Sequence, residues 1–562
     1  MNKNNGMMIL GIDVGGTHTD AVLIENFMIK KKSKVLTNEK DLLDSLWKVT
    51  NSILKEENPK MLKKVVLSTT ISTNAIVQGK TDRVGMILVN GPGLPPSLLR
   101  INEDCHFISG YVNHRGIEIT GIDRDSVSRI GEYFKGDGID HCGIVGKFST
   151  RNPCQEIDIE GIINAHVRHI SLGHRISGHL NFTRRISTTF LNEAIREIYS
   201  NFLNQVSNLM HLRDISAPVY ILKADGGTFD IIPSGEFPVQ TILSGPAASI
   251  MGILSMVPGK EDAIALDIGG TTTDIAVFAE GVPLLEALGI TISEHKTLIR
   301  GLRIKSLGVG GDSRIRCENG KTIIGPEREG PAAAFGGPSP TPTDAMIIIG
   351  LTSIGDKLRA KEAFLQIARD MHCSVEEAAK AIFEQTCGMI VSAVLAEIET
   401  INNKPVYTIH EILEGRKLKP TILYVVGGPA RPMSSRLGEL IGCPVHIPEH
   451  AEVANAIGAA LARTTAEITI FADTEQGIVT VGEEGERIHI SPGFTRKDAI
   501  KIGKEKLREK AIKMGARDED LEMDVTEDQE FNIVRGFSTT GKNIRIKVQI
   551  KPGLVASLRN GV

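Results

Sequence analysis

Asp13-Val14-Gly15-Gly16-Thr17-His18-Thr19-Asp20 recurs in the sequence as Asp267-Ile268-Gly269-Gly270-Thr271-Thr272-Thr273-Asp274, with six of the eight positions identical. An apolar run precedes each copy, at Met8–Ile12 and at Ala263–Leu266, and a second apolar run follows each. Two apolar runs joined by Gly-Gly predict a β-hairpin with the glycines in its turn. The copies are too widely separated for a solenoid, so we expect one such hairpin in each of two related lobes.

The residue types of this repeated turn predict a phosphate site. Glycines adopt positive φ angles and let backbone N–H groups approach an anion, and threonines add hydroxyl donors. The phosphate-binding candidates are Gly15, Gly16, Thr17, Thr19, Gly269, Gly270, Thr271 and Thr273. Asp13 and Asp267 end their strands and would repel phosphate, so we expect a cation, Mg²⁺ with retained waters, between them. A Gly-rich turn with Asp and Thr as turn formers is the alternative for one copy, and the second copy argues against it.

Composition excludes several function classes. The 562 residues are 41% hydrophobic and 23% charged, with a net charge of −4, so the chain has no bulk attraction for nucleic acid or for an anionic membrane. Aromatic residues make up 4%, with Trp47 the one tryptophan, which argues against a stacking platform for single strands. The 57 glycines are typical of an α/β protein with many tight turns.

Cysteine usage and the absence of long apolar runs indicate a cytoplasmic protein. The seven cysteines form no CxxC pair, which favours a reducing compartment. No signal-like segment or membrane-length apolar run is present in the sequence. Cys142 and Cys154 are candidate nucleophiles, but no activating partner can be assigned, and small buried hydrophobes are the ordinary alternative.

The chain is expected to form three domains: 1–210, 211–469 with a helical insertion near 356–415, and 470–562. Apolar spacing predicts a helix over Ser187–Met210 with Ser187 as its N-cap. The last domain is expected to be a small α+β unit joined through a polar, turn-like stretch, Ala472–Glu475. Its helix, Thr495–Met514, opens a segment from Arg496 to Arg517 with nine basic and three acidic residues. Such a helix docks a partner or nucleic acid, or is a solvated face, and the lack of interleaved aromatics favours the solvated face.

Seven of the fifteen histidines lie between His106 and His179. His106, His114 and His141 could join Asp104 or Asp137 at a transition-metal centre. Their spacing fits no closed zinc pattern, so surface or hydrogen-bonded histidines are the alternative.

Six ordered segments carry a resemblance to a known family: Ile9–Asp20, Ser68–Ala75, Leu243–Ala248, Ser306–Gly311, Gly325–Glu327 and Pro342–Ala345. Paired phosphate hairpins resemble the actin, sugar-kinase and heat-shock ATPase superfamily. In detail, the six segments resemble the opening and the GTT-x-x-TNA, SGPAA, SVGAGG, VGPE and TDA elements of the hydantoinase A/oxoprolinase family of ATP-dependent cyclic-amide hydrolases. The resemblance extends over about residues 8–465.

The resemblance implies an α/β, two-lobed actin-like (ribonuclease H-like) ATPase fold that binds ATP with Mg²⁺. It implies catalytic and metal-holding roles for Asp13 and Asp267, and a substrate position near Thr69, Thr70 and Asn74. Further cofactor-binding residues that it implies are Gly310, Gly311, Gly427 and Gly428, the last two bordering the adenosine.

The sequence also departs from the family pattern. Asp312 stands where the family usually has a third glycine, and Pro331–Gly337 is an eroded form of its PGPACYG stretch. Gly427-Gly428-Pro429-Ala430 replaces the usual GGAGP, and residues 91–115 share little with the family. The particular substrate is therefore not specified by the resemblance.

The function that follows is ATP-dependent ring opening of a cyclic amide such as 5-oxoproline or a hydantoin, through phosphorylation of the amide oxygen. The chain would act alone, as an oligomer, or as the ATP-handling subunit beside a hydantoinase B-type subunit. Two alternatives stay open: an ATP-driven switch acting on a partner protein, and a subunit of an ATP-dependent carboxylase. The expectation is of no nucleic-acid partner and no membrane.

Overall fold

The computed structural model describes residues 7–38, 41–257, 259–286, 288–318, 321–403 and 417–559. The chain divides into two compact units, and each is built from segments that are separate in the sequence. Unit 1 comprises Met1–Gly245, Glu286–Gly301 and Ala462–Val555, and unit 2 comprises Pro246–Leu285, Leu302–Leu461 and Ala556–Val562. The predicted domain boundaries at 210 and 470 stay predictions.

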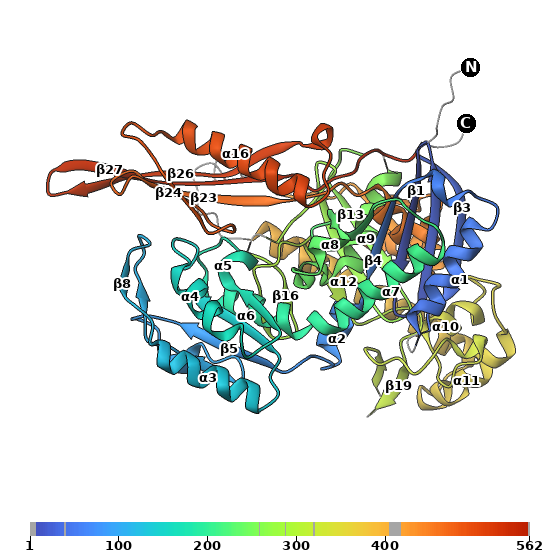
Figure 1. Ribbon diagram of the computed structural model, residues 1–562. Coiled ribbons are helices and arrows are strands. Elements are labelled where there is room, and N and C mark those ends of the chain that lie inside the picture. The colour runs from blue at the N-terminus through green and yellow to red at the C-terminus, as the bar shows by residue number, and fades with distance from the viewer. Residues whose placement is uncertain are drawn as a thin grey trace, which may run out of the picture. The chain divides into compact units, whose positions relative to one another are not determined.

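The first sheet of unit 1 has the strand order β12-β11-β4-β1-β2-β3 (Figure 1). Its strands are β1 (Met8–Val14), β2 (His18–Glu25), β3 (Met28–Leu36), β4 (Leu62–Thr69), β11 (Val219–Leu222) and β12 (Thr228–Asp230). β1 pairs with β2 antiparallel and with β4 parallel. The helices α1 (Leu42–Leu54) and α7 (Arg196–Leu212) bury Leu46, Phe202 and Val206 in one core with Leu10 and Leu67 of the sheet.

A second, parallel sheet in unit 1 has the order β10-β9-β5-β6. Its strands are β5 (Val84–Val89), β6 (Cys105–Phe107), β9 (His141–Gly146) and β10 (His169–Leu172), and a small ribbon pairs β7 (Tyr111–Val112) with β8 (Glu118–Thr120). The helices packed around this sheet are α3 (Arg124–Gly136), α4 (Cys154–Ile163), α5 (Gly173–Ile176) and α6 (Phe182–Ala194). Of the remaining helices, α2 (Ile71–Val77) contacts α7 and η3 (Pro238–Thr241), and α8 (Ile231–Ser234) contacts β11 and β12 of the first sheet. Phe134 of α3 and Ile159 of α4 pack with Ile87 and Ile144, whereas Phe182 of α6 packs with Met86 in a separate cluster. The sheet is therefore covered by helices.

The predicted N-cap at Ser187 is wrong. The structure has two helices where one was expected, and α6 begins after Asn181, whose side chain accepts a hydrogen bond from Arg184 N at 3.3 Å. Ser187 lies inside α6 and donates to Thr183 O at 3.4 Å. A serine inside a helix can satisfy its hydroxyl on the preceding turn, and the sequence pattern did not separate that case from a cap.

The third sheet of unit 1 is antiparallel, in the order β25-β24-β23-β27-β26. Its strands are β23 (Glu467–Asp473), β24 (Ile478–Val481), β25 (Glu486–His489), β26 (Met523–Arg535) and β27 (Ser538–Ile550), and α16 (Arg496–Lys513) lies along it (Figure 1). The stretch Ala472–Glu475, expected to be turn-like, is so only in its second half: Ala472 and Asp473 end the central strand β23, and Thr474 and Glu475 lie in the turn that follows. Arg115 makes two hydrogen bonds to Asp473, at 2.7 and 2.8 Å, so these polar residues are ion-paired side chains rather than a linker.

Unit 2 is built on a sheet with the order β15-β14-β13-β21-β22, with β18 paired to β14. Its strands are β13 (Ala263–Ile268), β14 (Thr273–Ala279), β15 (Val282–Pro283), β18 (Ile304–Leu307), β21 (Ile422–Val426) and β22 (Val445–His446), and β19 (Ile315–Glu318) pairs with β20 (Lys321–Ile324). The helices are α9 (Ser244–Met256), α10 (Pro342–Ile348), α11 (Lys357–Asp370), α12 (Val375–Asn402), α14 (Ala430–Ile441) and α15 (Ala454–Leu461). The helical insertion predicted near 356–415 is thus α11 and α12, while 404–415 lies outside the described residues.

One helix of the described part of the chain, α12, is long and apolar enough to cross a membrane by length and composition alone. Its residues Ile382, Cys387, Ile390 and Val394 are fully buried in cores formed with the sheet and the neighbouring helices. This packing is that of a core helix.

Candidate functional site

The first Gly-Gly turn joins β1 to β2. Gly15 N donates to His18 O at 3.0 Å and closes the turn. A Cβ on Gly15 would lie 2.9 Å from His18 O, so only glycine fits there without a shift of the backbone. A Cβ on Gly16 would meet nothing closer than 3.8 Å, at Asn74 Nδ2. The turn therefore needs glycine at one position and leaves the other open.

Thr37, which follows β3, stabilises this turn through hydrogen bonds to its backbone. Thr37 Oγ1 donates to Gly15 O at 2.8 Å, and Thr37 N donates to Thr17 O at 2.9 Å. Thr19 is fully buried, and its hydroxyl lies 3.0 Å from that of Thr37. Thr19, predicted as a phosphate donor, thus has its hydroxyl in a contact that supports the turn.

The predicted substrate residues lie beside this turn because β1 and β4 are parallel and their carboxyl ends meet at one edge. The register places Asp13 opposite Ser68 and Val14 opposite Thr69. Asp13 is buried and accepts a hydrogen bond from Ser68 Oγ at 2.5 Å. Thr70 N donates to Val14 O at 3.2 Å.

Helix α2 completes this first cluster. Asn74 Nδ2 donates to Thr70 Oγ1 at 3.3 Å, and the open face of Gly16 is directed at the same amide. Asp13, Gly16, Thr70 and Asn74 are therefore brought together, and the substrate position near Thr69, Thr70 and Asn74 stays a prediction.

The second Gly-Gly turn, between β13 and β14, has the same backbone closure. Gly269 N donates to Thr272 O at 2.9 Å, the counterpart of the bond in the first turn. Thr273 is fully buried and donates to Val309 O at 2.7 Å. Thr273, like Thr19, has its hydroxyl in a contact that supports the turn.

The loop from Gly308 to Asp312 packs directly on this second turn. Gly311 N donates to Gly269 O at 2.9 Å, and Asp312 N donates to Gly270 O at 2.7 Å. A Cβ on Gly310 would lie 2.6 Å from Gly269 O. Glycine at position 310 therefore permits a backbone-to-backbone approach that any side chain would block.

The turn after β21 also lies beside the second Gly-Gly turn. β13 and β21 are parallel, with Asp267 opposite Val426, so Gly427 follows directly beside Asp267. Gly427 has φ +98°, and a Cβ there would lie 2.2 Å from Ile268 O. A Cβ on Gly428 would meet nothing within 4 Å. The glycines that the resemblance assigned to the cofactor in unit 2 converge around one turn.

Three acidic side chains lie at the second turn, those of Asp267, Asp274 and Asp312, and the pKa of Asp274 is shifted. Burial raises the pKa of Asp274 to about 7, and the negative charge of Asp267 adds to the rise, against the lowering effect of the hydrogen bond from Ser306. Asp312 is paired with Arg328 at 3.2 Å. A cation near Asp267 and Asp274 would relieve this repulsion, so the donor set fits Mg²⁺, for which carboxylate oxygens and waters are the usual ligands.

The nucleotide also fits the backbone that is present. The open glycines are Gly16 and Gly428, where a Cβ would meet nothing closer than 3.8 Å, and backbone N–H groups at such positions can approach phosphate. The ATP candidates are Gly15, Gly16 and Thr17 in unit 1 and Gly269, Gly270, Thr271, Gly310, Gly311, Gly427 and Gly428 in unit 2. In each unit, one strand-ending aspartate, Asp13 or Asp267, adjoins the turn.

The histidine-rich segment forms a hydrogen-bonded interior. His141 Nδ1 lies 3.2 Å from Glu193 Oε2, and His174 Nδ1 lies 2.6 Å from Glu156 Oε2, with all four side chains buried. Asp104 is paired with Arg83. Within the described ranges, no group of three or more His, Cys, Asp or Glu side chains could hold a metal ion. The hydrogen-bonded alternative therefore describes His141 and His174.

Neither candidate cysteine nucleophile is activated. Burial raises the pKa of Cys142 well above its usual value, and burial with the nearby Glu118 raises the pKa of Cys154 to about 11. Both thiols stay protonated near neutral pH.

Several site residues were missed by the sequence analysis. Ser68 stood inside a quoted segment and Asp312 was noted as a departure, so their positions were available as signals. Ser306 also stood inside a quoted segment, but its pairing with Asp274 becomes visible only in the structure, and Thr37 lies outside every quoted segment.

Two family models, both describing hydantoinases and oxoprolinases, match the sequence. Hydantoinase/oxoprolinase matches residues 185–468, and the Hydantoinase/oxoprolinase N-terminal region matches residues 9–167. The caprolactamase subunit alpha of Pseudomonas jessenii is 22% identical over 479 residues, which cover 78% of this chain and 67% of that one. The 5-oxoprolinase of Saccharomyces cerevisiae is 30% identical over 195 residues, 32% of this chain and 14% of that one. The acetophenone carboxylase gamma subunit of Aromatoleum aromaticum is 22% identical and covers 79% of this chain and 69% of that one.

Two solved structures share the fold. Nucleotide-free acetone carboxylase superposes with a TM-score of 0.74 at 16% identity, covering 99% of this chain and 89% of that one. The ATP-dependent caprolactamase from Pseudomonas jessenii gives a TM-score of 0.72 at 19% identity, covering 96% and 87%. The expected α/β fold class is confirmed. The likeness of fold also continues past residue 465, where the sequence resemblance was expected to end.

Proposed function

This chain belongs to the hydantoinase/oxoprolinase family, and from that premise we propose that it uses ATP with Mg²⁺ to open a cyclic amide such as 5-oxoproline or a hydantoin. The observation that carries the proposal is the pair of Gly-Gly turns with the same backbone closure, each with a buried or partly buried aspartate near the end of its first strand. The ATP-dependent caprolactamase and the 5-oxoprolinase among its relatives support this choice of reaction.

The chemistry requires activation because an amide is a poor electrophile. Transfer of the γ-phosphoryl group to the amide oxygen releases ADP and makes the carbonyl carbon more electrophilic. One water adds to that carbon and the C–N bond breaks, so that the freed nitrogen becomes an amine and the carbonyl becomes an acyl phosphate. A second water then cleaves the acyl phosphate, and the products are ADP, phosphate and the ring-opened amino acid. The protein's part is mainly positioning and neutralisation of charge.

The residues of the two turns have distinct tasks in this proposal. Gly15, Gly16 and Thr17, with Gly269, Gly270 and Thr271, would donate N–H and hydroxyl groups to phosphate oxygens. Asp13 and Asp267 would hold Mg²⁺ through water or orient the nucleophile. Gly427 and Gly428 would border the adenosine, and the amide would lie near Thr69, Thr70 and Asn74.

A carboxylase subunit is the second candidate. The fold is shared with acetone carboxylase, and one relative is an acetophenone carboxylase subunit. In that case the ATP-handling residues keep their roles and the acceptor of the phosphoryl group is a ketone or carbonate. Two of the relatives are named as subunits, which supports a partner chain of the hydantoinase B type. The proposed compartment is the cytoplasm.

An ATPase screen tests the proposal. The purified chain, alone and with the protein encoded beside it, is assayed with ATP and Mg²⁺ against 5-oxoproline, hydantoins and larger lactams. Stimulation by a lactam with matching release of the amino acid supports the hydrolase. Stimulation that depends on bicarbonate and a ketone supports the carboxylase, and stimulation by a partner protein alone supports the switch.

A further inference from the structure

A cavity of about 160 Å³ lies within unit 1, at the end of the first sheet where β1 and β4 begin. This end lies away from the Gly-Gly turn, which follows β1. The apolar lining of the cavity comprises Met7, Ile9, Phe27, Pro218 and Val555. A single water needs ~10–15 Å³ measured in this way, so the cavity has room for roughly eleven to sixteen non-hydrogen atoms. It is therefore large enough for a small organic molecule.

Lys64, on β4, is one of the polar residues that line this cavity. Its Nζ donates to Ala462 O at 2.9 Å and lies 4.7 Å from the centroid of the Tyr220 ring. Within the described part of the chain, this amine makes no other hydrogen bond and has no carboxylate oxygen within 4.0 Å. An ammonium group has three N–H donors, so two of the three make no hydrogen bond to the described residues.

The other charged residues of the lining are Lys63, Arg517 and Asp520. Arg517 Nε donates to Asp520 Oδ2 at 2.8 Å, so this carboxylate already has a cation. Burial lowers the pKa of Lys64 to about 8, the positive charge of Arg517 adds to the fall, and Asp520 opposes it. Because an amine one pH unit below its pKa is about one-tenth neutral, Lys64 has an appreciable neutral fraction near neutral pH.

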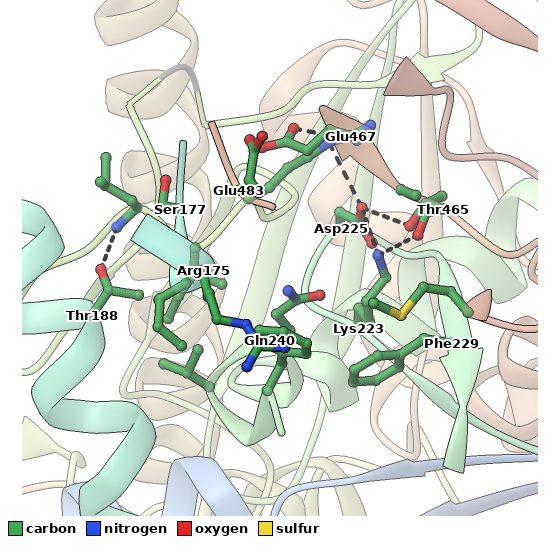
Figure 2. Close-up of a pocket in the computed structure, with 18 of the residues that line it drawn as sticks. Arg175, Ser177, Thr188, Lys223, Asp225, Phe229, Gln240, Thr465, Glu467 and Glu483 are labelled. Atoms are coloured by element: carbon green, nitrogen blue, oxygen red, sulfur yellow. Dashed lines mark hydrogen bonds and ion pairs between the residues drawn. The ribbon is translucent and has the colours of Figure 1, made fainter. Parts of the chain in front are cut away.

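A lysine in a second cavity of unit 1 has different surroundings (Figure 2). Lys223 Nζ donates to Thr465 O at 2.8 Å and lies 3.6 Å from Asp225 Oδ2, and Figure 2 shows the three residues together. Burial lowers the pKa of Lys223 as well, but the charge of Asp225 opposes the fall. That cavity therefore stabilises an ammonium, whereas the cavity at Lys64 favours the neutral amine, which is a nucleophile.

The groups around Lys64 Nζ match an iminium better than an ammonium. A protonated Schiff base has a single N–H on its nitrogen, and Ala462 O is a single acceptor for it. Its positive charge would lie over the face of the Tyr220 ring, where a cation is stabilised by the ring electrons. The carbon skeleton attached to the nitrogen would pack on the apolar lining, which includes Ile9 and Phe27.

We infer that Lys64 is a Schiff-base site for an apolar aldehyde or ketone small enough to occupy this cavity. The neutral Nζ adds to the carbonyl carbon and forms the C–N bond. The nitrogen gives up its two protons, the carbonyl oxygen leaves as water, and the imine takes up one proton to become the iminium. The reaction needs neither an oxidant nor a reductant. The inference is independent of the proposed function, because the cavity contains none of the residues of the Gly-Gly turns.

Reductive trapping in the whole chain tests the inference. The protein is incubated near neutral pH with benzaldehyde and sodium cyanoborohydride, whose hydride reduces an iminium to a stable benzylamine, and the labelled lysines are identified by peptide mass spectrometry. Lys48, an exposed lysine paired with Asp44 at 2.6 Å, is the internal reference. We expect Lys64 to be labelled at least ~10-fold faster than Lys48, because more of its amine is neutral and the aldehyde is held beside it. Labelling of Lys64 no faster than that of Lys48 would overturn the inference.

Two further arms locate the reaction in the cavity. Ala516 lines the cavity, and Ala516→Trp should slow the labelling of Lys64 by benzaldehyde at least ~10-fold by filling the space. Leu212→Trp is the matched control: this exposed residue of α7 does not line the cavity, so labelling should be unchanged. Pyrenecarboxaldehyde, whose four fused rings exceed the cavity, should label Lys64 of the unchanged chain no faster than Lys48, and this arm carries the test if Ala516→Trp fails to fold. Fast labelling of Lys64 by pyrenecarboxaldehyde, or by benzaldehyde in folded Ala516→Trp, would show that the aldehyde does not occupy the cavity and would overturn the inference.

Discussion

The two Gly-Gly turns share six of eight residues and the same backbone closure. The aspartates that end the two motifs, Asp20 and Asp274, nevertheless differ in the residue that faces them from the neighbouring strand. In unit 1 the strand beside the hairpin places Lys34 opposite Asp20, and the two are paired at 2.8 Å. In unit 2 the equivalent strand places Ser306 opposite Asp274. The repeated motif thus determines the backbone of the turn, while the neighbouring strand, which the motif does not include, determines its charge.

The largest effect is expected from removing the strand-ending carboxylates. Asp13→Asn and Asp267→Asn keep shape and remove one negative charge each beside the proposed metal. If both act on the metal and on the transition state, turnover should fall at least ~10²-fold, about 2.7 kcal/mol of barrier, with little change in melting temperature. Steady-state ATPase rates and thermal melts measure this. A fall in only one variant would make the turns functionally unequal, and full turnover in both would make the aspartates turn formers.

The second prediction concerns the pH dependence of stability. The pKa of Asp274 is about 7 in the folded chain against 3.8 ordinarily, so between those values the folded state holds a proton that the unfolded chain has released. The free energy of unfolding should therefore fall as pH rises from about 4 to 7, by up to ~1.4 kcal/mol per pH unit. Urea unfolding across this range, without Mg²⁺ or nucleotide, measures it.

Variants sharpen that test. Asp274→Asn should remove this contribution to the slope, and Ser306→Lys should reduce it by supplying the cation that Asp20 has in the first turn. Asp20→Asn is the matched control and should leave the contribution of Asp274 in place. An unchanged slope in Asp274→Asn would show that the carboxyl titrates normally.

The third prediction compares one glycine position in the two turns. A Cβ on Gly270 would lie 2.7 Å from Asp312 Oδ2, whereas a Cβ on Gly16 meets nothing closer than 3.8 Å. Gly270→Ala should therefore destabilise the chain more than Gly16→Ala does, by about 1–2 kcal/mol, the range typical of overpacking. Chemical denaturation of both variants checks this. Equal losses would mean that the Asp312 side chain moves aside without cost.

The smallest effect is expected at Thr273, one of the threonines that support the turns. Thr37→Val removes the donor to Gly15 O and the partner of the Thr19 hydroxyl, and Thr273→Val removes the donor to Val309 O. At about 1 kcal/mol net for one hydrogen bond, Thr37→Val should cost about 2 kcal/mol and Thr273→Val about 1 kcal/mol. Denaturant midpoints measure the pair, and equal losses would contradict the added contribution of the Thr19 contact.

Much of the fold and of the site could be predicted from the sequence because the signals are local. The apolar runs around each Gly-Gly turn predicted the hairpins, and the family resemblance assigned the glycines at 310, 311 and 427 to the same site as Gly269. Contacts made by residues outside the quoted segments, such as the hydrogen bond from Thr37 Oγ1 to Gly15 O, have no local pattern. The turn expected at Ala472–Glu475 begins only after Asp473, for a related reason: Asp473 is a strand residue that is polar because it pairs with Arg115, and polarity alone does not distinguish such a pair from a linker.

The discontinuous chain path of unit 1 has a consequence for biosynthesis. In strand β12, Thr228 N donates to Arg463 O and Asp230 N donates to Met514 O. Both acceptors are translated after the whole of Leu302–Leu461, so β12 cannot form these hydrogen bonds until then. At about 5–20 residues per second, that interval lasts on the order of ten seconds or more. Through this time the nascent chain exposes an unfinished sheet edge, which is a target for aggregation and for chaperones. A ribosome that stalls before Ala462 would release unit 1 without its last sheet, so the full translated length is a condition for its assembly.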